Sequence, residues 1–259
     1  MSDVQQKIKQ YRRKMGAIVF WVACWQLLSM IIDNNISLAS PAQVIQSLFG
    51  LVQTKDFWVT VFSSITKIGG GFFLAVLIAN LLALVTSCFE MIKEMIQVIM
   101  QIIKSIPVAS FIILALLWIK SSNLSVLISF LMVLPIIYSN VMKGIESTDR
   151  KLLEMAKVYR MTNAKKLRYI YLPAILPYFV SACSVGLGFC WKSGIAAEII
   201  GIANNSIGGR LYEAKIYLNT EELFAWTVVI VCISIFFEKL VMYLIRKASR
   251  MIIKVKAEG

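Results

Sequence analysis

The chain has 259 residues, of which 59% are hydrophobic and 16% charged, and its formal net charge is +13 at pH 7. A soluble domain of this size cannot cover so much apolar surface, because much of a small domain's surface stays exposed to water. The chain contains no histidine, which excludes Ser–His and Cys–His nucleophile pairs and HExxH zinc sites.

Six apolar stretches reach the roughly 20 residues that an α-helix needs to cross about 30 Å of hydrocarbon. The alternating pattern of a membrane β-barrel is absent, and backbone groups in lipid must pair within their own segment. The sequence therefore predicts an all-α polytopic membrane protein with six transmembrane helices. The predicted spans are residues 15–33, 57–86, 95–119, 124–142, 171–191 and 223–245.

Three segments outside or within these spans carry signals of their own. After the first span, Ser40 can cap a short amphipathic helix that has Pro41 at its first position. The third span is interrupted at Pro107, which cannot donate a backbone hydrogen bond. Such a break either lines a translocation path or is an ordinary proline kink in a bundle. Residues 193–222 are mostly too polar to span and predict an outer loop with a short helix.

The small residues of the spans predict packing. Gly69, Gly70 and Gly71 should let neighbouring helices approach closely. The cysteines are scattered through apolar segments, which favours small buried hydrophobes over a redox or metal role. They are Cys24, Cys88, Cys183, Cys190 and Cys232. No metal site and no catalytic residue are predicted.

The lysines and arginines predict the orientation of the chain. They concentrate in residues 7–14, at Lys93, in 143–168 and in 246–256. The other connecting segments contain only Lys55, Lys120, Arg210 and Lys215. By the positive-inside rule, both termini and the 143–168 insert are cytoplasmic, whereas 34–56 and 193–222 are outside. The net charge then reflects topology and contact with anionic membrane lipid, not nucleic-acid binding.

The basic insert between spans four and five predicts a helix, a turn and a second helix. The second helix starts at a cap, either Thr162 or Asn163, and runs into span five at Leu172-Pro173. The helical faces are Leu152, Met155, Ala156 and Tyr159, and then Ala164, Leu167 and Ile170. A mere connection needs only a handful of residues, so the insert presents a shaped surface. The alternative is a basic helix lying on anionic lipid.

This insert resembles the "EAA" loop of ATP-binding cassette (ABC) importer permeases. That pattern is Glu-Ala-Ala, three residues, Gly, nine residues and Ile-x-Leu-Pro. The matching positions are Glu154, Ala156, Ile170, Leu172 and Pro173. Met155 replaces the first Ala and Arg160 replaces the Gly. "LASPAQVIQSL", "SSITKIGGGF", "KSIPVAS" and "WKSGIAAEIIG" are similar to segments of the nitrate/sulfonate/taurine group of these permeases.

The resemblance implies a type I ABC importer permease in a bacterial inner (plasma) membrane, crossing it several times. Such a permease forms the path for a small solute that an external binding protein delivers. It works as a pair, here a homodimer, on two cytoplasmic ATPase subunits that bind ATP and Mg²⁺. The chain itself would be neither an enzyme nor bound to a cofactor. Its expected parts are a basic cytoplasmic segment 1–14, a permease domain 15–245 with the coupling loop at 143–170, and a basic cytoplasmic tail 246–259.

The resemblance also assigns roles to single residues. Those assigned to ATPase coupling are Glu154, Met155, Ala156, Tyr159, Arg160, Met161, Thr162, Leu172 and Pro173. The candidate translocation path is Lys67, Lys104, Pro107, Trp191, Lys192 and Glu198, because charges within spans usually face a bundle interior. Snorkelling to the interface is the alternative for Lys192. If the usual Gly allows a left-handed turn, Arg160 costs roughly 1 kcal/mol there or moves the turn to its neighbours. Alternatively, Arg160 contacts its own ATPase.

Three other classes of membrane protein remain as alternatives, one of which is a purely structural membrane scaffold. A secondary transporter would have ionisable residues deep in its spans or paired inverted repeats, and neither is evident. The energy-coupling subunit of a vitamin transporter also has basic cytoplasmic helices, but its Ala-Arg-Gly motif is not found in this sequence.

Overall fold

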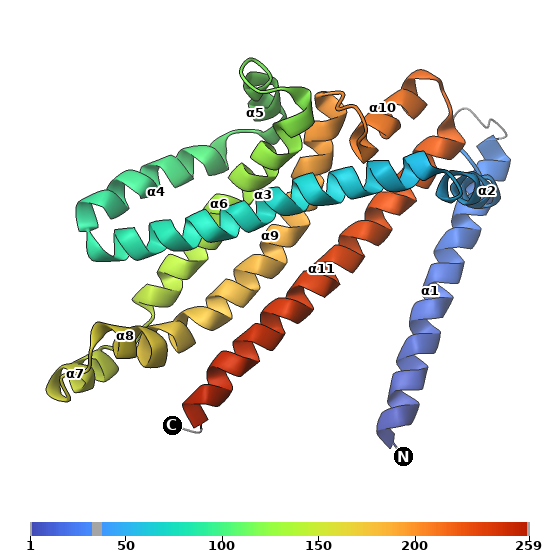
Figure 1. The fold of residues 1–259 in the computed structure, drawn as a ribbon. Coiled ribbons are helices and arrows are strands. Elements are labelled where there is room, and N and C mark those ends of the chain that lie inside the picture. Colours follow the sequence, from blue (N-terminus) through green and yellow to red (C-terminus); the bar gives the residue numbers. More distant parts are fainter. Residues whose placement is uncertain (1, 33–37, 258–259) are drawn as a thin grey trace. The chain divides into compact units, whose positions relative to one another are not determined.

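The structure of the protein is a computed structural model that describes residues 2–32 and 38–257. It describes the side chains of these residues except 2–11, 14, 18 and 250–257. Every regular element within the described ranges is a helix, as the all-α prediction requires (Figure 1). The elements are α1 (Ser2–Ile32), α2 (Pro41–Val52), α3 (Lys55–Cys88), α4 (Glu90–Ser105), α5 (Val108–Ala115), α6 (Ser121–Glu146), α7 (Arg150–Val158), α8 (Asn163–Lys166), the π-helix η1 (Leu167–Tyr171), α9 (Leu172–Ile200), α10 (Ile207–Ile216) and α11 (Thr220–Ala257).

Five helical stretches of the described chain are long and apolar enough to cross a membrane, and a bent helix pair makes a sixth candidate. The five are Met15–Ile32, Lys55–Cys88, Ser121–Glu146, Asn163–Ile200 and Thr220–Ser249. They contain the five uninterrupted predicted spans, except that the predicted end at residue 33 lies outside the described residues. The fifth span was predicted too short, because helix continues on both sides of 171–191.

The predicted interruption of the third span at Pro107 is confirmed, and the span consists of two helices. α4 and α5 meet at an angle of 101°, at the two residues Ile106 and Pro107. Pro107 has no N–H to donate, and its ring drives the preceding residue out of the helical region. Ile106 accordingly has the extended angles φ −77° and ψ 128°. Beyond Ala115 the chain forms turns, so the apolar run 95–119 does not continue as one straight span.

The expected domain boundaries fall within helices. Residue 15 lies inside α1 and residue 246 inside α11, so residues 2–14 and 246–257 continue the helices of two candidate spans. The segment 193–222 also differs from the prediction, because Ser193–Ile200 is the end of α9. Its expected short helix is present as α10.

The chain divides into two compact units, whose boundaries lie within α3, α10 and α11. The first consists of residues 1–59 and 210–230. Its α2 begins at the predicted cap: the Gln43 N–H donates to Ser40 Oγ, and the Ser40 N–H donates to Gln43 Oε1. Trp25 Nε1 donates to the Ala39 carbonyl at 3.1 Å. This bond ties α1 to the start of α2.

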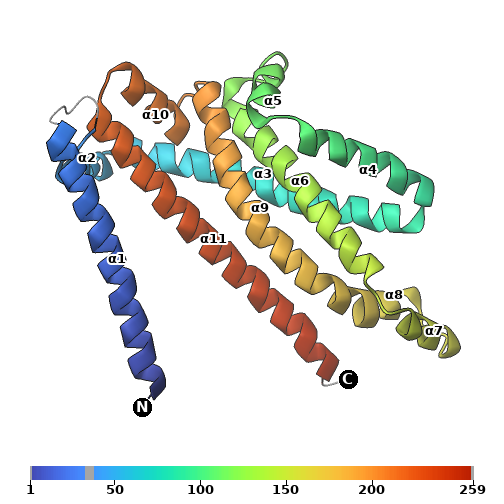
Figure 2. The same ribbon diagram turned by 180° about the vertical axis from the view of Figure 1, so that it is seen from behind.

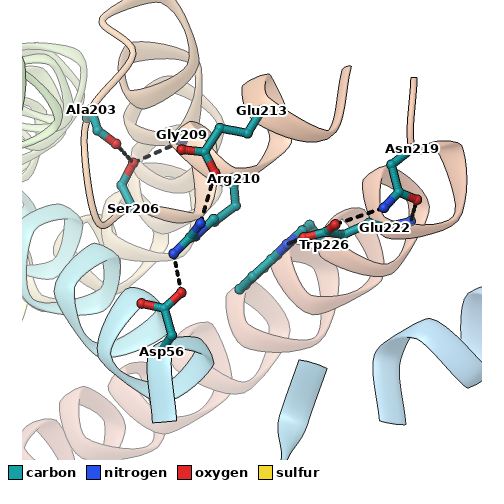
Figure 3. Close-up of polar contacts among 9 residues, drawn as sticks. All are labelled: Asp56, Ala203, Ser206, Gly209, Arg210, Glu213, Asn219, Glu222 and Trp226. Carbon is teal, nitrogen blue, oxygen red and sulfur yellow. Dashed lines mark hydrogen bonds and ion pairs between the residues drawn. The ribbon is translucent and has the colours of Figure 1, made fainter. Parts of the chain in front are cut away.

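Polar contacts of the same unit fix its short connections (Figure 3). The Arg210 guanidinium pairs with Asp56 at the start of α3 and with Glu213 on its own helix. Asn219 precedes α11 and accepts the N–H of Glu222 at 3.2 Å, while its amide donates to the Glu222 carboxylate. Trp226 Nε1 donates to that carboxylate at 3.2 Å. The first turn of α11 is therefore capped by side chains.

The second unit consists of residues 60–209 and 231–259. Within it, α6 and α9 lie side by side along much of their lengths (Figures 1 and 2). Glycine permits the close approach of α3 to α6, because a Cβ on Gly71 would lie 2.5 Å from the Val126 carbonyl oxygen. Gly194 of α9 similarly faces Ile68 and Ser129. These contacts confirm close packing at small residues.

Not every small residue packs as predicted. A Cβ on Gly69 would meet the Phe237 ring at 3.0 Å, whereas one on Gly70 would have nothing within 4 Å. The packing prediction is therefore wrong for Gly70. Cys183 and Cys190 are buried as expected, but Cys24 is only half-buried, and Cys88 and Cys232 are exposed. The position of each cysteine around its helix decides whether it is buried, since the residues of one apolar span face both inward and outward.

Candidate functional site

The insert between α6 and α9 begins with a capped helix. Asp149 has extended backbone angles and accepts the N–H of Lys151 at 2.9 Å, which satisfies one of the free donors at the start of α7. The negative charge of its carboxylate also interacts favourably with the positive, N-terminal end of the helix dipole. α6 ends at Glu146, and α7 begins after a short turn at Arg150 (Figure 1).

The end of α7 is a Schellman turn around Arg160. The Met161 N–H donates to the Ala156 carbonyl at 2.9 Å, and the Arg160 N–H donates to the Lys157 carbonyl at 3.0 Å. This pattern requires a left-handed residue, usually glycine, and Arg160 has φ 49°. The sequence predicted this strain for an arginine at the usual Gly position, and the left-handed turn indeed stays at Arg160.

The side chains of α7 are divided unequally between an inner and an outer face. Ala156 has no exposed surface, whereas Val158 is 80% and Tyr159 74% exposed. Leu152 and Met155 are exposed as well. The predicted exposed face therefore differs from the observed one at two residues. Ala156 packs inward, and Val158, which was not predicted on this face, is exposed. Glu154 is exposed beside this apolar surface.

The second helix of the insert, α8, has four residues and continues directly into the wider π-helix η1. Thr162 occupies the cap position of α8, although its side chain makes no capping hydrogen bond. After four residues the chain enters η1, in which the Leu172 N–H donates to the Leu167 carbonyl, five residues back. Pro173 follows directly, and its ring would crowd the carbonyl four residues before it in a regular α-helix. The wider π-turn relieves this clash and leads into α9.

Glu198 is the most deeply buried acid of the described chain and lies near the end of α9. It has no exposed surface. Its Oε2 accepts the Ser64 hydroxyl at 2.9 Å and the Gly208 N–H at 3.1 Å. The Ser64 oxygen in turn accepts the Ile207 N–H at 2.9 Å. One carboxylate and one hydroxyl thus satisfy two free N–H groups at the start of α10.

The other carboxylate oxygen of Glu198 is unsatisfied. Oε1 is buried and makes no hydrogen bond of ordinary geometry with a described residue, although Ser125 Oγ, which is buried in the same way, is close enough to interact with the carboxylate. A buried acceptor without a donor costs roughly 1–3 kcal/mol. Lys67 interacts electrostatically with Glu198, so the structure brings together these two candidate path residues.

The remaining candidate path residues lie in different surroundings. Lys104 is exposed at the end of α4, where its Nζ donates to Ser139 Oγ of α6 at 2.7 Å. Pro107 forms the break between α4 and α5. Lys192 is exposed. Trp191 is buried with its ring edge-on to Phe237, at 5.6 Å between centroids, which is a packing environment.

Sequence reasoning missed the partners of these residues. Ser64 and Gly208 hold Glu198, and Ser139 receives Lys104, yet none of the three was singled out. Ser64 lies 134 positions from Glu198, and no local pattern links residues so distant. Lys67 was the signal in the sequence that could have pointed to Ser64, because Ser64 lies one helical turn before Lys67 on the same face of α3.

Within the described part of the chain, His, Cys, Asp and Glu side chains nowhere gather in a group of three or more that could hold a metal ion. The donor set around Glu198 is one carboxylate with serine hydroxyls and backbone N–H groups. The N–H groups and the nearby Lys67 ammonium suit an anion such as the carboxylate itself. This site is thus built to hold a helix end in place.

Known proteins similar to this chain are transport permeases. It is 26% identical over 221 residues to a probable ABC transporter permease of Brucella melitensis biotype 1, covering 83% of this chain and 87% of that protein. It is 24% identical over 237 residues to the taurine transport system permease protein TauC of Escherichia coli K12, covering 89% and 86%.

The fold is also similar to that of a solved protein. An amino acid ABC transporter crystallised with histidines shares it at a TM-score of 0.52 and 19% identity, over 86% of this chain and 97% of that one. Residues 71–252 match the family described as "Binding-protein-dependent transport system inner membrane component". The chain therefore belongs to this family and is a permease subunit of an ABC importer.

Proposed function

We propose that α7 and the turn Arg160–Thr162 dock on a cytoplasmic ATPase subunit and transmit its movements to α9. The proposed assembly contains two copies of this chain, two ATPase subunits that bind ATP and Mg²⁺, and an external solute-binding protein. The insert and both chain termini face the cytoplasm in this arrangement, as the distribution of lysine and arginine favours.

One observation carries the docking proposal: α7 exposes large apolar side chains on a helix outside the candidate spans. They are Leu152, Met155, Val158 and Tyr159. Exposed apolar groups gathered on one short element mark an interaction surface. A partner cleft would cover them, with the charges of Glu154 and Arg160 at the rim. A lipid surface would favour lysines around the whole patch, whereas Glu154 lies beside it.

The connection to the membrane part supports transmission of movement. η1 and α9 follow the turn without a break in the helical backbone, and Leu172 and Pro173 lie at this junction. A displacement of α7 would pass across the turn at Tyr159–Thr162 to α8 and from there through continuous helix into α9. α9 also bears Glu198 at its far end, so a displacement carried into α9 would reach the helix that holds the buried carboxylate.

A proposed solute path includes Lys67, Lys104 and the break at Pro107, with Glu198 and Lys192 at its outer part. Charges at membrane depth are costly, so they face a polar interior or one another. Lys104→Met and Glu198→Gln should each lower uptake by proteoliposomes that hold the whole importer and its own binding protein. Uptake at the wild-type rate by either variant would remove that residue from the path.

The docking proposal is tested by Met155→Glu, which places a charge on the exposed face of α7. Burying this charge in an interface should weaken the affinity for the ATPase subunits at least about tenfold. The affinity is measured with the purified full-length permease in nanodiscs and immobilised ATPase subunits of the same importer.

Ala164→Glu is the matched control, because Ala164 is also exposed in the insert but belongs to α8. It adds the same side chain and the same charge. Equal affinities for wild-type and Met155→Glu permease would show that this face of α7 is not the docking surface. A similar loss in both variants would show only a general charge effect and would also contradict the proposal.

A further inference from the structure

A cleft of about 530 Å³ lies between α4 and the second half of α6. Its lining residues are Gln97, Met100, Gln101, Lys104, Ser105, Tyr138, Ser139, Met142, Lys143 and Glu146. The volume falls within the range of roughly 300–1,000 Å³ that is usual for small-molecule sites. Two lysines, two primary amides and two serine hydroxyls line it, against one carboxylate.

The charges of the cleft are not balanced within the described chain. Its single acid, Glu146, is already paired with Lys93 at 2.6 Å, and Lys93 does not line the cleft. Lys104 donates to the neutral hydroxyl of Ser139. Lys143 has no hydrogen bond or ion pair with any described residue. Two ammonium groups therefore face one cavity without an acid to neutralise them, and like charges so placed repel each other.

Among the neutral polar groups, the side-chain amides are free to donate, whereas the Ser105 and Ser139 hydroxyls donate to backbone carbonyls. The Ser139 hydroxyl donates to the Pro135 carbonyl at 2.6 Å and accepts from Lys104, so it holds the Lys104 ammonium at the cleft wall. The side-chain amides of Gln97 and Gln101 lie one helical turn apart on α4 and make no hydrogen bond with the described residues. Each has an NH₂ group to offer. Ammonium and amide donors around one cavity match the acceptor oxygens of an oxyanion.

We propose that this cleft binds an anionic group with several acceptor oxygens, such as a phosphate. Lys104 and Lys143 would neutralise it, Gln97 and Gln101 would hydrogen-bond it, and Met100 with Met142 would contact an apolar part. The same chemistry comes from two sources, a free anion in the aqueous phase or the phosphate of an anionic lipid headgroup. The inference uses the proposed function only for the cytoplasmic orientation of this end of α6.

The position of the cleft gives its occupant an effect on the insert. Lys143 and Glu146 lie in the last turn of α6, and α7 begins at Arg150 after a three-residue connection. An anion between Lys104 and Lys143 would fasten the end of α6 to α4. It would thereby restrict the helix from which the insert extends.

Binding is tested with the full-length permease alone, so that a failure of ATPase docking leaves the result unaffected. The permease is placed in phosphatidylcholine nanodiscs, and its binding of radiolabelled inorganic phosphate is measured by equilibrium dialysis. In a second arm, permease extracted from vesicles of phosphatidylcholine and phosphatidylglycerol is examined by native mass spectrometry for retained phosphatidylglycerol.

The test variant is Lys104→Gln/Lys143→Gln, and the matched control is Lys55→Gln/Lys120→Gln, which removes the same charge from exposed lysines outside the cleft. Affinity or retention should fall about tenfold or more in the test variant, since two charge-assisted contacts are lost, and should persist in the control. Lys143→Gln alone is the second variant, because the Lys143 side chain makes no hydrogen bond or ion pair with a described residue that folding could need.

Each result decides between the sources or overturns the proposal. Phosphate binding that the test variant loses assigns the cleft to a free anion. Phosphatidylglycerol retention that the test variant loses, without phosphate binding, assigns it to a lipid headgroup. Absence of both, or equal binding by wild-type, test and control proteins, overturns the proposal.

Discussion

The backbone N–H of Met161 donates to the carbonyl oxygen of Ala156 at 2.9 Å, and this bond closes the end of α7 around a left-handed Arg160. Two other helices among the described residues end in the same way, around Ile202 with φ 48° and Leu218 with φ 54°. A residue with a Cβ in this region costs about 1–2 kcal/mol. The strain at Arg160 lies within the proposed docking segment, so substitutions there can separate a backbone effect from a side-chain contact.

Arg160→Gly should raise the thermal stability of the purified permease, because glycine adopts the left-handed conformation without steric cost. The expected gain is about 1 kcal/mol in the free energy of unfolding. The gain is followed as a rise in the temperature at which half of the monodisperse protein is lost on heating. Arg160→Ala is the control, since it removes the guanidinium but keeps the strain.

ATPase affinity measured on the same two variants shows what the guanidinium does. If both variants bind the ATPase as the wild type does, the side chain is not a partner contact. If both bind more weakly, Arg160 contacts the ATPase directly. A stability of Arg160→Gly below that of Arg160→Ala would contradict the left-handed geometry.

Gly71→Ala should destabilise the packing of α3 on α6. Its Cβ would lie 2.5 Å from the Val126 carbonyl oxygen and 2.9 Å from the Ser129 Cβ, and overpacking of this kind costs roughly 1–3 kcal/mol. Gly70→Ala is the matched control one residue earlier, where a Cβ meets nothing within 4 Å. It should leave stability unchanged or raise it. Equal melting temperatures of the two variants would show that α3 does not approach α6 at Gly71.

Glu198→Ala should destabilise the permease more than Glu198→Gln does. The alanine variant leaves the Ser64 hydroxyl and the Gly208 N–H without their acceptor, and each buried unpaired group costs roughly 1–3 kcal/mol. Glutamine keeps one acceptor oxygen at this position. Thermal unfolding of both variants, with Glu94→Ala at an exposed acid of α4 as control, measures the difference. A Glu198→Ala protein as stable as wild type would rule out the carboxylate as the anchor of α10.

The predicted topology can be tested with single cysteines at Gln53, Asn163 and Asn204, all exposed. Cys183 and Cys190 are buried and can stay, so only Cys24, Cys88 and Cys232 need replacement. An impermeant thiol reagent added to intact cells should label the sites at 53 and 204 and spare the one at 163. Labelling at 163 from outside would contradict the cytoplasmic position of the insert.

The sequence predicted those features that depend on a few neighbouring residues. The capping box at Ser40 and the position of the break at Pro107 follow from one or two residues each, and hydropathy located the long helices. The 101° angle between α4 and α5 did not follow, because a proline fixes where a helix ends but not the direction of the next one.

Contacts between distant segments account for what the sequence did not predict. The carboxylate of Glu198 was expected near a path, and its role at the start of α10 depends on Ser64 of another helix. Ala156 was expected on the docking face because it is spaced with Met155 and Tyr159. Helical spacing defines faces but does not say which one packs inward, and Ala156 is on the inner one.

The π-turn of η1 also has a consequence for the facing of the insert. Each residue of a regular α-helix turns the chain by about 100° and advances it by about 1.5 Å, whereas a π-turn holds one residue more than an α-turn. The extra residue of Leu167–Tyr171 is therefore accommodated within the turn, and the helix on either side keeps nearly the direction it would have without it. A residue added or removed in the regular helix of α9 would instead rotate α7 and α8 by about 100° around the axis of α9, and a different set of α7 side chains would point toward a partner. The length of the helix between the insert and the membrane part, as much as the composition of α7, therefore decides which surface the insert offers.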